Sequence, residues 1–298
     1  MPQKTVLVVN ADPELETILS EVLQPNEWTV ERVPDNRTVL ARAQLKPFDL
    51  IITNEKTSGA EDVELLRKIR RVQPHTRLII LADKTTPQDV IESMRQGAFS
   101  YFSTPIPMSS FAEVVRMAAN GPCWDDGIEV LSATPAWLRL AARCDRQTAD
   151  RLLQFIHEFD ELPEPERTNV ATAFREILLN AMEHGGHFDP EQYVEIGYVR
   201  TNRMIMCRVK DPGEGFSLLE LRHAAVTNPP DDPIQHLACR QAMGLRPGGF
   251  GLMVSQSMVD ELIYNEKGND VLLVKYLDDA AHVPVKRMQI IPEREWRS

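Results

Sequence analysis

The sequence of 298 residues contains little cysteine, and its cysteines form no pattern. They stand far apart and lack the paired spacing of structural zinc sites. Their positions are Cys123, Cys144, Cys207 and Cys239. A disulfide-stapled secreted domain and a zinc-binding module are therefore excluded. We expect the four thiols to be small core residues in a reducing cytoplasm.

Long hydrophobic runs and an excess of basic residues are missing too. No stretch comes near the roughly 20 apolar residues that span a bilayer, and we expect no signal peptide. We therefore expect a cytoplasmic protein without a membrane segment. The net charge is −11, and residues 121–298 carry 28 acidic against 19 basic residues, a balance of −9. This charge argues against nucleic acid as a partner.

The length, with 43% hydrophobic residues, is enough for two domains with ordinary cores. Asn120-Gly121-Pro122 ends a helical pattern, and Asp125-Asp126-Gly127 follows it, which indicates a linker. We predict a first domain over 1–121, a linker over 122–127, a second domain over 128–278 and a C-terminal tail over 279–298. The tail is mixed in charge, and no chemistry is predicted for it.

Continuous apolar runs alternate with helical patterns through the first 120 residues. Such runs are typical of strands buried on both faces of a parallel sheet. The strands are expected at 5–9, 28–33, 49–53, 77–82 and 98–102, and the helices near 13–24, 36–45, 60–72, 86–95 and 107–120. Five such units predict an α/β domain of the flavodoxin-like, doubly wound type. Its functional crevice lies at the carboxyl ends of the strands.

With its segments 49–54 and 97–105, this pattern resembles a response-regulator receiver domain over residues 4–120. The resemblance implies a phosphorylation site, and the chain departs from that site at each of five positions. The two acids are replaced by Asn10 and Ala11, the phosphoacceptor aspartate by Asn54, the switch hydroxyl residue by Ala82 and the lysine by Thr104.

These replacements remove the chemistry of a receiver. An amide lacks the anionic oxygen that attacks a phosphoryl donor, and without the two acids the site loses the charge that holds Mg²⁺. Asp12 and Glu55 stand nearby in the sequence, and we do not expect them to restore it. The domain is then either a relic that keeps the fold soluble, or a module that docks a partner or a second copy of the chain. We prefer docking, so a homodimer is one expectation.

The second domain contains a helix with two polar residues on one face. Glu176 and Asn180 are four residues apart, so their side chains project from the same side of a helix. A carboxylate beside an amide oxygen suits a hard cation that keeps several waters. Alone, such a pair usually belongs to a solvated helix face.

Two glycine motifs follow this helix. The first places one acidic acceptor beside a backbone that a ligand can approach closely. The second leads into a helix over 250–261, whose free N–H groups attract phosphates. Alone, each motif is an ordinary turn or loop. The first consists of Asp211, Gly213 and Gly215, and the second of Gly248, Gly249 and Gly251.

In this order and spacing, the three motifs resemble the N, G1 and G2 boxes of the GHKL ATPase superfamily, over residues 128–277. The resemblance implies the Bergerat fold, an α/β two-layer sandwich, and binding of ATP with Mg²⁺. No helical hairpin with a phosphoacceptor histidine precedes the domain, which disfavours a histidine kinase. His157 lies among apolar residues of an upstream helix and is expected to be a partly buried core residue.

The domain is also too short for a topoisomerase or a chaperone. Among the other members of the superfamily, the domain resembles the anti-sigma-factor serine kinases of bacterial partner-switching systems. That resemblance implies that Glu176 is the general base, Asn180 the Mg²⁺ ligand and Asp211 the acceptor for adenine. It implies transfer of the ATP γ-phosphate to a Ser or Thr of a STAS-type antagonist protein. The alternative is a non-catalytic, nucleotide-gated protein that sequesters a sigma factor or another signalling partner; Glu176 favours the kinase, because a binder needs no base.

The remaining segments of the second domain give a coarser prediction. The 32 residues between Gly215 and Gly248 are rich in Pro and Asp, and this length indicates a lid that orders over bound ATP. His184 either supports the site or caps the motif helix. We expect strands at 128–131, 193–199, 204–210, 262–265 and 271–276, and one long or two shorter helices over 135–159.

Overall fold

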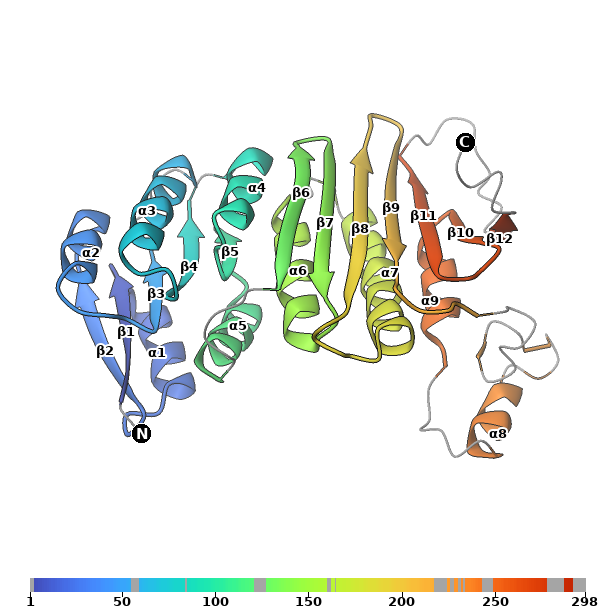
Figure 1. Cartoon of the computed structure of the whole chain (residues 1–298), viewed down its shortest axis with the longest axis horizontal. Coiled ribbons are helices and arrows are strands. Elements are labelled where there is room, and N and C mark those ends of the chain that lie inside the picture. Colours follow the sequence, from blue (N-terminus) through green and yellow to red (C-terminus); the bar gives the residue numbers. More distant parts are fainter. Residues whose placement is uncertain are drawn as a thin grey trace. The chain divides into compact units, whose positions relative to one another are not determined.

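The computed structural model divides the chain into two compact units (Figure 1). The first comprises Met1–Glu129 and Asp150–Glu161, and the second Val130–Ala149 and Leu162–Ser298. The structure describes residues 3–54, 59–83, 85–120, 127–159, 162–163, 165–216, 224–225, 228–229, 232, 234–242, 249–277 and 287–291. The expected linker, apart from Gly127, lies outside these ranges. The expected domain bounds remain predictions.

The first unit has the predicted doubly wound α/β fold. Its five strands form one parallel sheet in the order β2-β1-β3-β4-β5. The strands are β1 (Lys4–Val9), β2 (Trp28–Val33), β3 (Leu50–Thr53), β4 (Arg77–Ala82) and β5 (Ser100–Ser103). The helices are α1 (Pro13–Val22), α2 (Asn36–Ala43), α3 (Gly59–Val72), α4 (Pro87–Arg95) and α5 (Met108–Asn120).

Apolar side chains from the strands and from helices α1 and α5 form one large buried cluster. Strand residues such as Val8 and Ile52 meet Leu19 of α1 and Phe111 of α5 there. Helix α1 packs against α5, and α3 packs against both α2 and α4. The near-continuous apolar strands are explained by this packing, because both faces of the sheet are buried.

Strand β5 ends the sheet, and side chains of Arg151 and Glu158, which belong to the same unit, form hydrogen bonds with the backbone of β5 and of the two residues before it. The Arg151 guanidinium donates to the carbonyl oxygens of Phe99 (2.7 Å) and Ala98 (3.3 Å), and it lies 4.3 Å from the centre of the Phe99 ring. The Ser103 N–H donates to the Glu158 carboxylate at 3.0 Å. Arg151 is only 2% exposed, so its bonds to the strand edge form in a low-dielectric setting.

Replacing Arg151 with methionine is therefore expected to lower the free energy of unfolding by about 1–3 kcal/mol, because buried carbonyl oxygens lose their donor. Urea unfolding followed by circular dichroism measures the change. The exposed Arg139 provides the matched control, and Arg139→Met should have little effect. Equal effects of the two substitutions would contradict a special role for Arg151.

The second unit is built on one seven-stranded sheet in the order β12-β10-β11-β9-β8-β7-β6. Strand β12 pairs with β10 in parallel, and the pairs from β7 to β8, β8 to β9, β9 to β11 and β11 to β10 are antiparallel. The strands are β6 (Ile128–Thr134), β7 (Trp137–Arg143), β8 (Tyr193–Arg200), β9 (Met204–Lys210), β10 (Glu261–Asn265), β11 (Asp270–Tyr276) and β12 (Arg287–Ile291).

Helices α7 (Glu166–Asn180) and α9 (Gly251–Met258) pack against each other on one face of this sheet (Figure 1). Alternate strand residues are buried, as in Leu138, Leu140 and Ala142 of β7. The other residues of the strand are more exposed, so the unit is the predicted α/β two-layer sandwich. Two of the cysteines, Cys144 and Cys207, are buried as expected.

Two predictions for this part of the chain are wrong, and one strand was not predicted. Residues 137–143 form strand β7, and the helix α6 (Arg146–Phe159) starts only afterwards, where Asp145 accepts the N–H of Thr148 at 2.8 Å. Within 137–143 the burial has a period of two, which is typical of a strand. Strand β12 lies within the expected tail, where no strand was predicted. The His157 side chain is 43% exposed, so it is not a core residue.

Candidate nucleotide site

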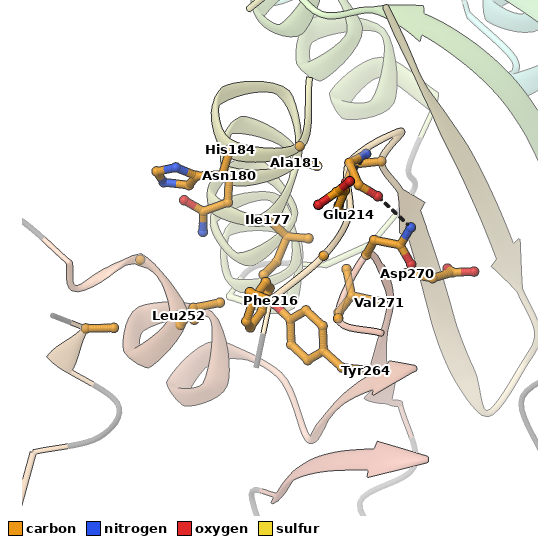
Figure 2. A pocket seen from close by; sticks show the side chains of 18 of the residues that line it. Ile177, Asn180, Ala181, His184, Glu214, Phe216, Leu252, Tyr264, Asp270 and Val271 are labelled. Atoms are coloured by element: carbon orange, nitrogen blue, oxygen red, sulfur yellow. Dashed lines mark hydrogen bonds between the residues drawn. The ribbon is translucent and has the colours of Figure 1, made fainter. Parts of the chain in front are cut away.

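A cleft of about 510 Å³ opens between elements of the second unit. Its walls come from the end of α7, the loop that follows β9, the start of α9 and the hairpin between β10 and β11 (Figure 2). Acidic, amide, glycine and apolar residues line it together. Residues of the three sequence motifs, which are spread over 176–251, therefore line one cavity.

The C-terminal end of helix α7 presents polar and apolar side chains to this cleft. Val170 and Phe174 are buried, while Ile177 lines the cleft together with Asn180 and His184, which stand one turn apart (Figure 2). His184 thus lies where the site interpretation expects it. Glu176 stands one turn before Asn180, with its side chain 33% exposed. Its neighbour Arg175 places a guanidinium nitrogen 3.5 Å from the Glu176 carboxylate.

Glycine at the start of α9 brings two helices together. A β-carbon at Gly251 would lie 2.7 Å from the Glu176 Oε2 atom and 3.5 Å from the Asn180 Nδ2 atom. The missing side chain leaves room at the N-terminal end of α9, where backbone N–H groups are free to bind an anion. Gly249 also lines the cleft, with φ at +88°. Gly248 lies outside the described residues.

Asp211 stands at another wall of the cleft, directly after β9. Its carboxylate accepts the N–H of Gly213 at 2.8 Å. Burial raises the pKa of Asp211, and the bond from Gly213 opposes that shift. A β-carbon at Gly185 would come within 2.2 Å of the Asp211 Oδ1 atom. This close approach follows from the π-helical turn η1 (Ala181–Gly185), which ends the motif helix against the loop.

The motifs did not reveal the aromatic and apolar side of the cleft. Phe216 and Tyr264 meet edge to face with ring centres 5.3 Å apart, and Val271 and Leu252 complete an apolar surface (Figure 2). Burial raises the pKa of Tyr264, which is therefore a neutral phenol. Such a surface suits a flat, largely apolar ring, and the acidic acceptor beside it suits an exocyclic amino group.

Family comparisons agree with this arrangement. The model of the histidine kinase-like ATPase domain matches residues 140–275, and that of the response regulator receiver domain matches residues 6–116. An anti-sigma F factor of Bacillus cytotoxicus is 30% identical over 130 residues, which cover 42% of this chain and 80% of the relative. The chain belongs to the histidine kinase-like ATPase family. A receiver domain precedes its ATPase domain, and domains of this kind bind ATP.

Other relatives match through the receiver domain. The DNA-binding transcriptional regulator NtrC of Azospirillum brasilense is 25% identical over 120 residues, covering 40% of this chain and 25% of the regulator. The Fimbriae Z protein of Salmonella typhimurium is 24% identical over 123 residues, which cover 41% of this chain and 59% of that protein. The chain thus spans 25% to 59% of the length of these relatives. Among solved structures, a response regulator of Thermotoga maritima is similar to this chain, with 20% sequence identity and a TM-score of 0.33. The match covers 40% of this chain and 99% of that structure.

The segment between the two glycine motifs of the ATPase domain is described only in part. Helix α8 (Gln235–Ala242), which the sequence did not predict, lies within it. His236 of this helix is fully buried, with its ring 4.6 Å from that of Phe250 and its backbone N–H donating to Asn228 Oδ1 at 2.9 Å. Arg240 of α8 lines the cleft. Closure of the segment over ATP stays a prediction.

In the receiver domain, asparagine side chains occupy the place of the reactive acids. The Asn54 amide donates to the carbonyl oxygen of Asn10 at 3.1 Å, and the Asn10 amide donates to that of Asn54 at 3.3 Å. Asp12 accepts the N–H of Leu15 at 2.8 Å as the N-cap of α1. Thr104 donates its hydroxyl to the Ala82 carbonyl at 3.3 Å. These polar groups bond to the protein's own backbone, and Glu55 lies outside the described residues.

We therefore expect the receiver domain not to respond to small phosphoryl donors. Acetyl phosphate, or beryllium fluoride with Mg²⁺, should leave the amide spectrum of residues near Asn54 unchanged, because position 54 carries an amide in place of the reactive carboxylate. Nuclear magnetic resonance measures this directly. A saturable, magnesium-dependent shift of those signals would contradict the prediction.

Two properties of the described residues bear on cofactors and membranes. No three His, Cys, Asp or Glu side chains in these ranges lie close enough together to hold a metal ion by themselves. Magnesium does not require such a cluster in nucleotide sites, because substrate phosphates and water supply most of its ligands. Among the same residues, no helix is both long and apolar enough to cross a membrane.

Proposed function

We propose that the chain is an ATP-dependent protein serine/threonine kinase that modifies a small partner protein. The observation that carries the proposal is the position of the Glu176 carboxylate, against Gly251 at the start of α9 and one turn before Asn180. Glu176 itself is not one of the residues that line the cleft, but its carboxylate lies beside Gly251, which is, and a carboxylate in that position suits a general base. A site that only binds nucleotide has no use for it.

The Asp211 end of the cleft suits the adenine base. The Asp211 carboxylate is an acceptor for an exocyclic amino group, and Phe216, Tyr264 and Val271 provide an apolar surface for the ring. Glycine at 185 and 213 lets this carboxylate lie close to the backbone, since a β-carbon at either position would come within 3 Å of it. Recognition then combines one directional polar contact with apolar packing.

This role predicts a pH dependence of ATP affinity. The acceptor must be ionised, and burial raises the pKa of Asp211. Affinity should therefore fall as the pH drops through this raised pKa, above the value of about 4 that is usual for aspartate. Calorimetric titration with ATP between pH 7 and pH 5 measures the change, with Asp211→Asn as the control, whose affinity should stay low and flat. The same slope in both proteins would contradict the role of Asp211.

The opposite end suits the phosphates and Mg²⁺. Asn180 provides a neutral oxygen ligand that lines the cleft, and the N-terminus of α9 provides N–H groups for phosphate oxygens. This donor set fits Mg²⁺, which takes one or two protein oxygens beside phosphates and water. When bound, Mg²⁺ neutralises charge on the phosphates. Asn180 and Gly251 orient the phosphate chain, while Glu176 remains available to the acceptor.

In the transfer step, the Ser or Thr oxygen of the partner forms a bond to the γ-phosphorus. The bond from that phosphorus to the β–γ bridging oxygen breaks, and its electron pair leaves with ADP. The hydroxyl proton passes to the Glu176 carboxylate. The donor, acceptor and base therefore account for every atom without a further reactant.

The acceptor we propose is a STAS-type antagonist protein, and a sigma factor is a second candidate partner. The similarity to an anti-sigma F factor over 80% of that relative supports this class of partner. The receiver domain, which lacks the reactive acids, would dock such a partner or a second copy of the chain. Magnesium and ATP are the expected cofactor and phosphoryl donor.

A second function is favoured by one contact. The Arg175 guanidinium lies 3.5 Å from the Glu176 carboxylate, so Glu176 has an ion-pair role that requires no proton transfer. The chain would then be a nucleotide-gated protein that sequesters a sigma factor without modifying it. Both side chains are a third or more exposed, so the pair is weak, and we prefer the kinase.

Incubating the full chain with γ-labelled ATP, Mg²⁺ and STAS-type proteins from the same cell distinguishes the two functions. The kinase predicts label on a Ser or Thr of one of these proteins, identified by mass spectrometry. Tight ATP binding and a stable complex with a partner that stays unlabelled would favour the gated binder instead.

A further inference from the structure

The glycine loop 211–216 and the hairpin loop 265–270 are in direct backbone contact. A β-carbon at Gly215 would lie 2.0 Å from the carbonyl oxygen of Lys267, and one at Gly268 would lie 2.2 Å from that of Phe216. Both glycines have positive φ, +83° and +82°. Neither position tolerates a side chain, so each loop limits the conformation of the other.

Hydrogen bonds join the two loops around Gly213. Its carbonyl oxygen accepts the Asn269 side-chain amide at 3.1 Å and the Lys267 ammonium at 3.2 Å. The Asn269 carbonyl oxygen in turn accepts the N–H of Asp211 at 3.0 Å. Asn269 therefore bonds both to Asp211, the residue expected to accept a hydrogen bond from adenine, and to Gly213, two residues later.

Asn265 shapes the hairpin loop that carries Asn269. Its side-chain oxygen accepts three successive backbone N–H groups, those of Gly268, Asn269 and Asp270, at 2.8, 3.1 and 3.2 Å. Its side-chain nitrogen donates to the Asn269 side-chain oxygen at 3.0 Å. This last bond orients the Asn269 amide so that its nitrogen faces Gly213. The two asparagines thus form a short relay from the hairpin to the glycine loop.

We propose that Asn265 and Asn269 are positioning residues for the nucleotide base. They hold the loop 211–216 in the conformation in which the Asp211 carboxylate faces the cleft. The inference rests on the proposed binding of ATP in this cleft. A loop with two glycines loses much conformational freedom when it is ordered, so ordering it before binding lowers the cost of binding. The relay contacts only the base end, and Glu176 and Asn180 lie on another element.

Asn269→Ala removes the donor to Gly213. The affinity for ATP and for ADP should fall by the same factor, roughly 3–10-fold, because both nucleotides carry the same base and one hydrogen bond is lost. Calorimetric titration of the full chain with each nucleotide measures this. In a transfer assay the KM for ATP should rise by that factor while kcat is unchanged. Asn202→Ala, in the exposed turn between β8 and β9, is the matched control and should change neither value.

Asn265 provides a test that separates the shape of the hairpin from the orientation of Asn269. Asn265→Asp keeps the oxygen that accepts the three N–H groups but lacks the nitrogen that donates to Asn269, so it should fold and yet bind ATP about as weakly as Asn269→Ala, and Asn265→Ala should bind no better. Thermal unfolding without nucleotide shows whether the variants fold. If Asn265→Ala does not fold, Asn269→Ala and Asn265→Asp are sufficient for the test.

The outcomes separate this inference from the proposed function. Wild-type protein that fails to bind ATP would overturn both. Wild-type protein that binds ATP, with Asn269→Ala binding equally well, would overturn the inference alone. Weaker ATP binding with unchanged ADP binding would also overturn it, because the effect would then lie at the γ-phosphate.

Discussion

The Glu176→Gln variant should bind ATP with nearly wild-type affinity while phosphoryl transfer slows by roughly 10²–10⁴-fold, the usual contribution of a positioned base. Glutamine has the same size and can keep the contact with the start of α9, where the Glu176 side chain lies beside Gly251. It cannot take the proton that leaves the acceptor hydroxyl. The loss should therefore appear in transfer and not in binding.

Calorimetry with ATP and single-turnover transfer of γ-label measure the two quantities separately. Glu166→Gln, in the first turn of the same helix, is the matched control and should change neither. Asn180→Ala should behave differently from Glu176→Gln, by weakening magnesium-dependent ATP binding as well as transfer. If Glu176→Gln abolished binding and Asn180→Ala did not, the two assigned roles would be wrong.

A single methyl group at Gly185 should strongly weaken ATP binding. A β-carbon there would lie 2.2 Å from the Asp211 Oδ1 atom, so the carboxylate has to move out of its position. Loss of a charge-assisted hydrogen bond to the base corresponds to roughly a 10–150-fold loss of affinity. Gly185→Ala is thus expected to disable the base end while leaving Glu176 and Asn180 intact.

Gly197 of β8 is the matched control for this substitution. A β-carbon at Gly197 would find its nearest neighbour, the Arg208 Cβ atom, at 3.5 Å, which is an ordinary contact. Gly197→Ala should therefore bind ATP as the wild type does. Thermal unfolding of both variants without nucleotide separates a local effect from a loss of folding. Wild-type affinity in Gly185→Ala would show that Asp211 does not accept a hydrogen bond from adenine.

Much of the fold could be predicted because its periodic patterns are clear. The strands of the first unit are apolar throughout and separated by regular helices, so their order along the chain left few alternatives. Strand β7 was missed because its residues 137–143 run almost directly into α6, and apolar residues over the joined stretch also fit a helical spacing. Strand β12 was missed because it is short and lies at the edge of the sheet, where it pairs in parallel with β10.

The candidate site could be predicted only in part, because local motifs are visible in the sequence and contacts between distant segments are not. Glu176, Asn180 and Asp211 stand in short local motifs with recognisable spacing. The partners that shape the site come from elsewhere in the sequence. The contact between Gly185 and Asp211 depends on a π-helical turn, which leaves no mark in the spacing of residues. Asn269 and Tyr264 reach the cleft only because β11 pairs with β9 and β10.

Titrating the full chain with ATP and Mg²⁺, in wild-type and Asp211→Asn form, tests the central claim most directly. The account predicts saturable ATP binding by the wild type, much weaker binding by Asp211→Asn, and discrimination against GTP in the wild type only, because guanine has no amino group at the position where adenine carries one. Equal affinities of both proteins for ATP, without preference over GTP, would contradict the assignment of this cleft as an adenine nucleotide site.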